Sequence, residues 1–169
     1  MQAVHELGHI LGAWATGADV TRVVLSPTTI SRTDVANNTH PLLFAWAGPV
    51  MGVTLPLLLW YGAHATGLAG AFVLRFFAGF CLLANGLYIG LGSFAGVGDC
   101  GEMLKHGSPP WQLWLFGAFT APVGLALWHR QGASFGLGTV EGQVSHSIAY
   151  ASLAVCGMLL LMALAVGGQ

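Results

Sequence analysis

The sequence predicts an all-α integral membrane protein with about five transmembrane helices and a small β-hairpin after the first helix. Three observations support this fold class: an extreme composition, a series of five apolar segments, and one polar stretch rich in β-branched residues. Of the 169 residues, 55% are hydrophobic and only 7% are charged. A typical soluble domain carries about 25% charged residues. The chain therefore lacks the polar side chains that a water-facing surface needs, and we expect much of its surface to face lipid.

The composition also excludes several classes of function. Five Lys and Arg residues stand against six Asp and Glu residues, so the net charge is −1. No cationic stripe is present to meet phosphates, which excludes nucleic acid as a partner. The high apolar content excludes intrinsic disorder. The three cysteines are widely spaced and form no CxxC pair, so neither a disulfide framework nor a cysteine zinc site is predicted.

The first apolar segment covers residues 2–16, and Gly17 is a plausible helix stop. At about 1.5 Å per residue this helix is about 22 Å long, which is shorter than a hydrocarbon core of about 30 Å. A complete span would need one or two more turns before Met1. We therefore expect the printed sequence to lack the beginning of this helix.

A polar stretch over residues 18–40 follows the first segment. Its β-branched run, Asp19–Leu25, predicts a strand. Ser26–Pro27 then predicts a turn, and Thr28–Arg32 predicts a second strand that pairs with the first. The stretch is therefore expected to form a small hairpin.

Four further spans are predicted over residues 41–61, 68–91, 111–128 and 144–166. The first of these contains Ala47-Gly48-Pro49 and Pro56, so a kink is expected there. A glycine-rich passage over residues 92–101 separates the third and fourth apolar segments. All six tryptophans lie near predicted span ends, which is typical of the aromatic belts at membrane interfaces.

The distribution of basic residues predicts an orientation. The face with the loops after the first and third segments carries Arg22, Arg32 and Lys105, whereas the opposite face carries Arg130. Because basic residues concentrate in cytoplasmic loops, the first face is expected to be cytoplasmic.

The motif that carries chemistry is His5-Glu6-Leu7-Gly8-His9, an HExxH sequence in the first apolar segment. Two histidines four residues apart lie one turn above the other on a helix, so their imidazoles can share one zinc ion. Glu6 lies beside them and is placed to take a proton from a zinc-activated water. Ionisable groups in an apolar segment are costly and point to function. The motif therefore predicts a catalytic zinc site.

A catalytic zinc usually has three protein ligands and one open position, so a third ligand must come from elsewhere in the chain. Asp99 and Glu102 are the only acids between Asp34 and Glu141. The glycines around them permit a tight backbone path that could bring a carboxylate to the metal. The residues alone leave Asp99 and Glu102 as alternatives for the third ligand.

With these features the sequence resembles the site-2 protease family of intramembrane zinc metallopeptidases. The resemblance depends on His5–His9 in an apolar first helix, the strand-like stretch after it, and Ala47-Gly48-Pro49 in the next span. It also depends on Asn85 in the third span and on the Gly98-Asp99 pair that follows. These features lie within residues 1–104, and the last two spans add none.

The resemblance implies a role for each matching residue. His5, His9 and Asp99 would be zinc ligands, Glu6 the general base, and Asn85 a substrate-binding residue. Residues 1–169 would form a single membrane-embedded domain, in which 1–104 are the metallopeptidase-like core and 105–169 add two spans. The substrate would be a transmembrane or membrane-associated protein. The location would be the plasma (inner) membrane of a prokaryote, with the active site nearer the cytoplasmic face.

Two other functions remain open from the residues. A non-enzymatic membrane scaffold or assembly protein could keep the same residues as a structural zinc site, in which the fourth coordination position is closed. A transporter fits the composition, but no pair of charged or broken helices in matching halves supports it.

Overall fold

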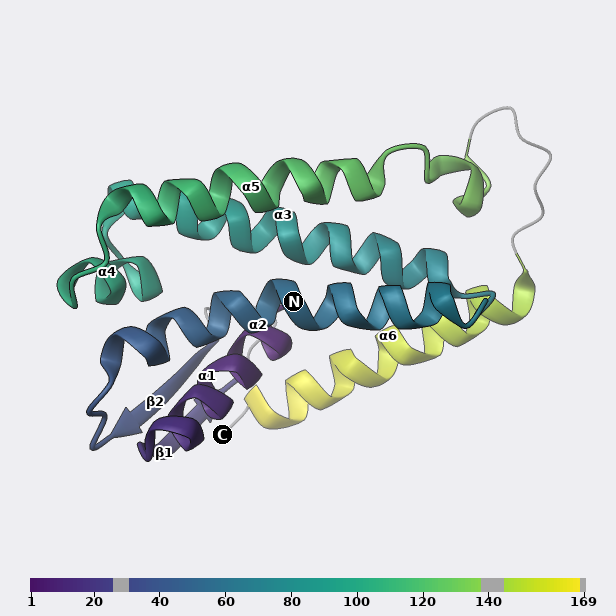
Figure 1. The fold of residues 1–169 in the computed structure, drawn as a ribbon. Coiled ribbons are helices and arrows are strands. Elements are labelled where there is room, and N and C mark those ends of the chain that lie inside the picture. Colours follow the sequence, from purple (N-terminus) through teal and green to yellow (C-terminus); the bar gives the residue numbers. More distant parts are fainter. Residues whose placement is uncertain (26–30, 138–144, 168–169) are drawn as a thin grey trace.

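The computed structural model of the chain describes residues 1–25, 31–137 and 145–167, the last five by their backbone alone. Three long helices lie alongside one another: α2 (Pro41–Ala65), α3 (Ala71–Ala95) and α5 (Pro110–Trp128). Helix α3 lies between the other two and packs against both, and α1 (Gln2–Thr16) packs on α2 (Figure 1). The prediction of a mostly helical chain is therefore confirmed.

Helix α1 has the bounds that the sequence predicts. It ends at Thr16 because Gly17 adopts the left-handed conformation, with φ 73°, which stops the helix. The buried face carries His5, Glu6 and His9 together with two glycines and an alanine. The polar residues of the HExxH motif thus point into the protein and toward α2.

The small hairpin is confirmed, although its second strand lies later in the chain than predicted. Strands β1 (Asp19–Val24) and β2 (Arg32–Ala36) pair antiparallel, with Val20 opposite Val35 and Val24 opposite Arg32. Of the predicted second strand, Thr28–Arg32, the described residues are Ser31, which precedes β2, and Arg32, which begins it. Residues 26–30, including the predicted turn at Ser26–Pro27, lie outside the described residues.

A short helix, α4 (Gly98–Lys105), occupies the passage predicted only as glycine-rich. It joins α3 to α5 and lies at the same end of the molecule as the hairpin (Figure 1). Beyond α5 come a 3-10 turn, η1 (Gly132–Phe135), and α6 (His146–Gly167). The described side chains of α6, over residues 146–162, are exposed at all but two positions.

The structure supports fewer membrane spans than the five predicted. Among the described residues, only α2 and α3 are both long and apolar enough to cross a membrane. Helix α1 has 15 residues, and the described side chains of α6 cover only His146–Met162. Helix α5 has 19 residues, but it is not among the helices that are long and apolar enough to cross a membrane.

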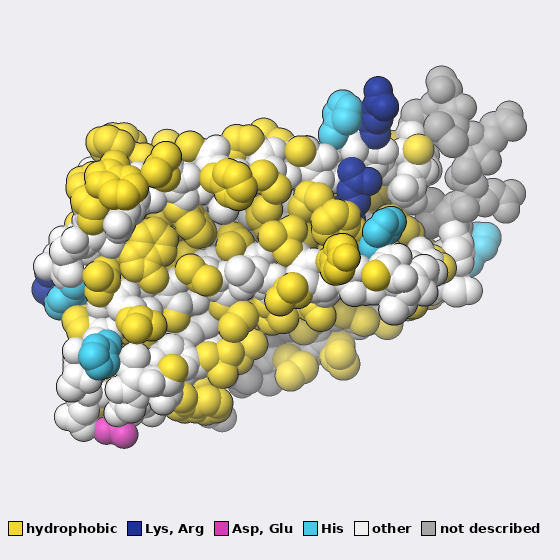
Figure 2. All heavy atoms as spheres, viewed as in Figure 1, with side chains coloured by type: hydrophobic (Ala, Val, Ile, Leu, Met, Phe, Trp, Pro, Cys, Tyr) yellow, Lys and Arg dark blue, Asp and Glu magenta, His cyan; other side chains and the backbone are white. Residues whose placement is uncertain are grey.

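The surface of these helices is strongly apolar. Only 33% of the most apolar window of α2 and 39% of that of α3 are buried, whereas the core helix of a soluble protein would be mostly buried. Large apolar side chains such as Leu58, Phe94 and Phe119 are 66%, 76% and 74% exposed. Figure 2 shows hydrophobic side chains over the middle of one face, with charged and histidine side chains gathered toward its ends.

Helices α3 and α5 pack closely through glycines. A Cβ atom on Gly117 would lie 2.7 Å from the Gly86 carbonyl oxygen and 2.9 Å from the Gly90 Cα. The two backbones therefore approach more closely than any larger residue would permit. This contact is on the side of α3 away from α2, so α3 is packed between α2 and α5.

Candidate metal centre

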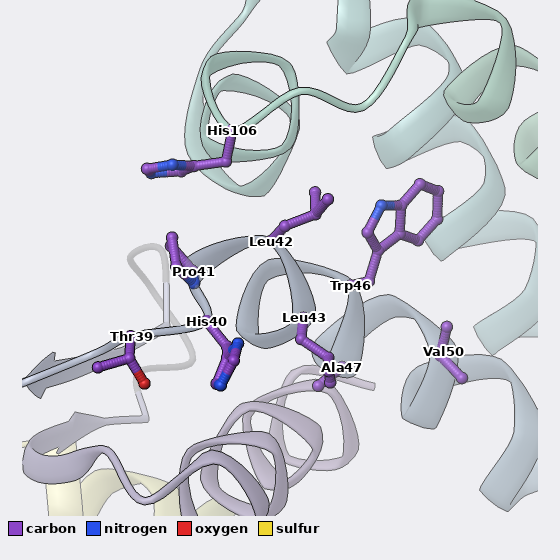
Figure 3. Close-up of a pocket in the computed structure, with 9 residues that line it drawn as sticks. All are labelled: Thr39, His40, Pro41, Leu42, Leu43, Trp46, Ala47, Val50 and His106. Atoms are coloured by element: carbon purple, nitrogen blue, oxygen red, sulfur yellow. The ribbon is translucent and has the colours of Figure 1, made fainter.

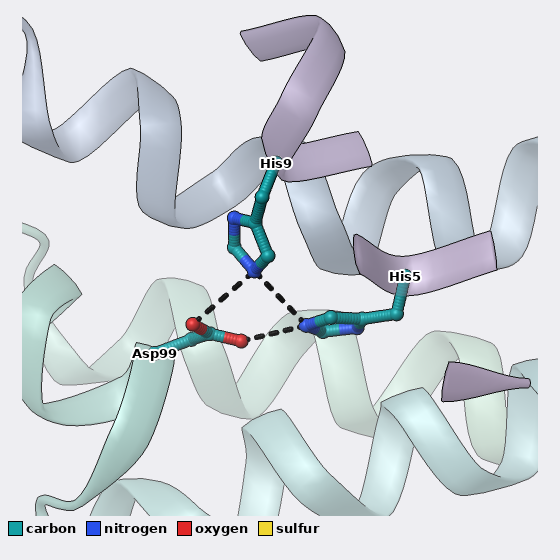
Figure 4. A group of neighbouring side chains, drawn as sticks. All are labelled: His5, His9 and Asp99. Atoms are coloured by element: carbon teal, nitrogen blue, oxygen red, sulfur yellow. Dashed lines mark hydrogen bonds and ion pairs between the residues drawn. The ribbon is translucent and has the colours of Figure 1, made fainter. Parts of the chain in front are cut away.

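Three side chains from two helices converge on one point. His5 and His9 lie one turn apart on α1, and their Nε2 atoms are 3.1 Å apart. Asp99, from the first turn of α4, places Oδ2 2.7 Å from His5 Nε2 and Oδ1 3.3 Å from His9 Nε2 (Figure 4). These ligand atoms all lie within 4.8 Å of one another. The fold thus brings together residues that are 94 positions apart in the sequence.

The other nitrogen of each imidazole already has a partner that fixes the position of its proton. His9 Nδ1 lies 2.9 Å from the Phe44 carbonyl oxygen, which can only accept, so His9 Nδ1 carries the proton. Asn85 Nδ2 donates to the Cys81 carbonyl oxygen at 2.8 Å, which turns Asn85 Oδ1 toward His5 Nδ1 at 2.8 Å. His5 Nδ1 therefore donates as well. In the neutral histidines both Nε2 atoms carry lone pairs directed at the same point as the carboxylate.

This arrangement fits a metal ion. Two imidazole lone pairs at 3.1 Å repel each other unless a proton or a cation lies between them. Zinc binds histidine nitrogen and carboxylate oxygen at about 2.0–2.2 Å, so neighbouring ligand atoms in a tetrahedral site lie roughly 3.3 Å apart. The separations of 3.1 Å between the two Nε2 atoms and 3.3 Å between His9 Nε2 and Asp99 Oδ1 are close to that value, whereas His5 Nε2 and Asp99 Oδ2 lie at the hydrogen-bond distance of 2.7 Å.

Two glycines of α2 make room for the centre. A Cβ atom on Gly48 would collide with His9 Nε2 and would lie 2.8 Å from His5 Nε2, against both of the converging nitrogen atoms. A Cβ atom on Gly52, one turn later, would lie 2.7 Å from the Asn85 amide. Gly48 belongs to the Ala47-Gly48-Pro49 sequence that contributes to the family resemblance. The close approach of His5 and His9 is the physical reason for a glycine at this position.

Glu6 is buried beside the histidines. Its side chain is part of a residue that is only 4% exposed, and its Oε2 accepts a hydrogen bond from Thr33 Oγ1 at 2.8 Å. One residue before β2, Ser31 donates to Gln2 at 3.2 Å in the same way. Ser31 and Thr33 are two residues apart in an extended segment, and their partners Gln2 and Glu6 are one turn apart on α1. These two hydrogen bonds attach the hairpin to α1.

A cavity of about 400 Å³ adjoins the centre, and its wall contains Glu6 and two of the three converging side chains, but not His9. His5, Asp99, Asn85 and Tyr88 also line it. This volume has room for water and part of a ligand beside the metal position. The centre is therefore buried but has open space on the Glu6 side.

The backbone conformation of Gly98 sets the position of Asp99. Gly98 adopts φ 60°, in the left-handed region that favours glycine, and the next residue begins the first turn of α4. Burial alone would raise the pKa of the Asp99 carboxyl, but hydrogen bonds and charge from the two imidazoles, with protons in the place that a cation would take, outweigh it and hold the pKa below its usual range. The carboxylate is thus in the ionised form that a metal ligand needs.

The remaining predicted residues lie as follows. Asn85, expected to bind substrate, is completely buried, contacts His5 and the Cys81 backbone, and forms part of the cavity wall. Glu102, the alternative third ligand, is on the exposed side of α4 and pairs with Lys105 at 3.3 Å and His106 at 3.2 Å. In the structure it is therefore Asp99, not Glu102, that approaches the two histidines.

Sequence reasoning missed two residues of the site, Tyr88 and Thr33. Tyr88 lies three positions after Asn85 and hence on the same face of a helix, which is a signal that the sequence does contain. Thr33 had no such signal, because its contact with Glu6 depends on where the hairpin packs against α1.

A second and larger hollow of about 600 Å³ lies on the outer side of the first turns of α2. His106 of α4 borders it on one side, and His40, Leu43 and Trp46 border it on the other (Figure 3). Its lining is almost wholly apolar and contains neither His5 nor His9. The candidate metal centre therefore adjoins the smaller cavity.

Comparison of the chain with protein-family models, with curated proteins and with solved structures gave no match. What the centre can do follows from its donor set. Two neutral imidazoles and one carboxylate can hold a divalent cation with a position left open, and a buried glutamate lies along the same cavity wall.

Proposed function

We propose that this protein is a membrane-embedded zinc metallopeptidase that resembles the site-2 protease family. The observation that carries the proposal is the convergence of His5 Nε2, His9 Nε2 and the Asp99 carboxylate, with both Nδ1 protons directed elsewhere. Asp99, rather than Glu102, supplies the third ligand in this proposal. Glu6 borders the same cavity and supplies the base that hydrolysis requires.

Each residue has a defined part in the proposed reaction. When bound, zinc would polarise a peptide carbonyl and lower the pKa of a water molecule to about 7. Glu6 accepts the proton of the attacking water at Oε1, since Oε2 is engaged by the Thr33 hydroxyl. Glu6 then returns the proton to the departing amine nitrogen. Asn85 keeps His5 in the tautomer that presents Nε2, which gives it a positioning role beside the predicted substrate contact.

The apolar surface supports a membrane location and a substrate held in or on the membrane. Exposed apolar side chains cover α2, α3 and α5, and the described part of α6 is exposed along nearly its whole length. We therefore include α1, α5 and α6 with α2 and α3 in the membrane-embedded body. The peptide bond cleaved would belong to a transmembrane or membrane-associated protein.

Charge supports the proposed orientation, in the inner membrane of a prokaryote with the centre nearer the cytoplasmic face. Arg22 and Arg32 of the hairpin and Lys105 of α4 lie at the end of the molecule that also holds Asp99 (Figure 1). Arg130, after α5, lies at the opposite end. The excess of basic residues at the first end favours the cytoplasm for it.

The first test is the metal content of detergent-purified protein, measured by elemental mass spectrometry. Imidazole and carboxylate donors also suit iron, so the measurement counts both metals. We expect about one zinc per chain in the wild type, and none in His5→Ala, because two remaining ligands hold zinc weakly. Folded wild-type protein without zinc, even after reconstitution, would contradict the metal centre.

The second test is cleavage of single-span reporter proteins by wild type and Glu6→Gln in liposomes. Glutamine retains the shape of the side chain and cannot accept the proton, so Glu6→Gln should keep its zinc and lose cleavage by at least about 10²-fold. Equal cleavage by both proteins would contradict the role of Glu6. Full zinc in both proteins with cleavage in neither would favour a non-enzymatic scaffold with a structural zinc site.

A further inference from the structure

We infer that Tyr88 of α3 is a positioning residue that caps α4 and thereby holds Asp99 against the two histidines. The inference rests on the proposed metal centre and adds to it a residue that no motif marks. Tyr88 lines the same cavity as Asp99, His5 and Glu6.

The N-terminus of α4 has no cap of its own. Its N-cap residue is Val97, whose side chain has no oxygen to accept a hydrogen bond from the first turn. The first backbone N–H groups of a helix need an acceptor from outside the helix. Asp99 N–H donates to Tyr88 Oη at 3.1 Å, so a tyrosine from another helix supplies that acceptor.

The residues on each side of Asp99 also meet Tyr88. A Cβ atom on Gly98 would collide with Tyr88 Oη, which adds a steric requirement for glycine to that of its positive φ. Cys100 Sγ donates to the Tyr88 carbonyl oxygen at 3.3 Å. Three consecutive residues, 98–100, are therefore fitted to one tyrosine.

The Tyr88 ring also contacts a second ligand. Its edge meets the His5 ring at a centroid distance of 5.9 Å and an interplanar angle of 71°. Asn85, three residues earlier on α3, accepts the hydrogen bond of His5 Nδ1. One face of α3 thus orients His5 through Asn85 and fixes Asp99 through Tyr88. Partners of this kind commonly change metal affinity by about 10–100-fold when they are removed.

The test is the zinc affinity of the full chain in detergent, measured by competition with a chromophoric chelator. Tyr88→Phe retains the ring and removes only the hydroxyl, so Asp99 N–H loses its acceptor. We expect zinc affinity to fall by about tenfold or more. The melting temperature of the metal-free protein should change little, which separates positioning of the ligand from a general structural role. The visible spectrum of the Co²⁺-substituted variant should also change, because that spectrum reports the ligand geometry.

The chain offers two matched controls. Tyr61 and Tyr150 are the other tyrosines and are 67% and 70% exposed. Tyr61→Phe and Tyr150→Phe should bind zinc as the wild type does. Wild-type zinc affinity in Tyr88→Phe would overturn the inference, whereas absence of zinc binding in the wild type would overturn the proposed metal centre itself.

A second variant keeps the inference testable if Tyr88→Phe folds poorly. Gly98→Ala places a Cβ atom against Tyr88 Oη and should weaken zinc binding in a chain that keeps every ligand. If the Tyr88 hydroxyl is what the added methyl group of Gly98→Ala collides with, Tyr88→Phe removes that collision. The loss of zinc binding free energy in the double variant Gly98→Ala/Tyr88→Phe should then be smaller than the sum of the losses in the two single variants. Strict additivity would show that Tyr88 and the Gly98–Asp99 turn act independently.

Discussion

At the scale of single residues, the proton positions of two histidines decide what the centre can bind. The Cys81 carbonyl fixes the Asn85 amide, and the amide fixes His5 Nδ1 as a donor. The Phe44 carbonyl does the same for His9 Nδ1. Both Nε2 atoms are left as ligands because of these contacts.

Asn85→Ala should lower zinc affinity by about 10–100-fold, because His5 then lacks an acceptor for its Nδ1 proton. The measurement is the zinc content that remains after dialysis against a series of chelator concentrations. Cys81→Ala is the control, since it keeps the backbone carbonyl that Asn85 contacts. A wild-type zinc affinity in Asn85→Ala would show that the amide does not set the tautomer of His5.

The HExxH motif predicted His5, Glu6 and His9 correctly as neighbours, because helix periodicity alone brings positions five and nine to one face. The same reasoning selected Asp99 and Asn85 but could not define their contacts. Whether Asn85 meets a substrate or a histidine depends on how α3 is rotated relative to α1, which no local pattern encodes.

At the scale of elements, the crossing of α1 and α2 makes the metal position possible. A Cβ atom on Gly8 would lie 2.6 Å from the Met51 Cβ, and one on Gly12 would lie 2.6 Å from the Ala47 Cβ. The two helices are therefore in close contact along a line of small residues. Gly48 belongs to the same contact, and its backbone lies against the two Nε2 atoms.

Gly48→Ala should abolish zinc binding, because the added methyl group collides with His9 Nε2, crowds His5 Nε2 and displaces both imidazoles. The measurement is zinc per chain by elemental mass spectrometry. Gly62→Ala, in the same helix, is the matched control, because nothing lies within 4 Å of its added Cβ. That control should retain zinc and should be as stable as the wild type or up to about 1 kcal/mol more stable. Full zinc occupancy in Gly48→Ala would contradict the metal position.

The elements show where local patterns succeed. The bounds of α1 and the existence of the hairpin follow from apolar periodicity, a stop glycine and β-branched residues. The second strand was placed too early because Thr28–Arg32 and Arg32–Ala36 both contain β-branched residues. The contact between Thr33 and Glu6 is formed only by the later register.

At the scale of the whole molecule, α3 contacts the metal centre through Asn85 and Tyr88 on one face and packs against α5 on the other. Ile89 of α3 and Leu113 of α5 belong to the same buried cluster as Cys100 and Met103 of α4. The helix that orients His5 and Asp99 is therefore held by packing that contains no residue of the centre. Stability of α3 against α5 should control the integrity of the site.

Gly117→Val should destabilise the protein by about 1–3 kcal/mol, because the larger side chain forces α3 and α5 apart. The measurement is thermal unfolding of the metal-free protein in detergent. Gly157→Val in α6 is the control, since nothing lies within 4 Å of a Cβ at that position. Equal melting temperatures for the two variants would show that the α3–α5 contact contributes little to stability.

The sequence by itself determined the apolar, helical character of the chain and the spacing of His5, Glu6 and His9, because composition and helix periodicity are local properties. The residues alone left Asp99 and Glu102 as alternatives for the third ligand, and only the resemblance favoured Asp99. The tertiary structure brings Asp99 to His5 and His9 and leaves Glu102 exposed, because Gly98 and the turn into α4 direct Asp99 inward and Glu102 outward. It also decided the roles of Asn85, Gly48, Thr33 and Tyr88, since each depends on contacts between segments that are distant in the chain.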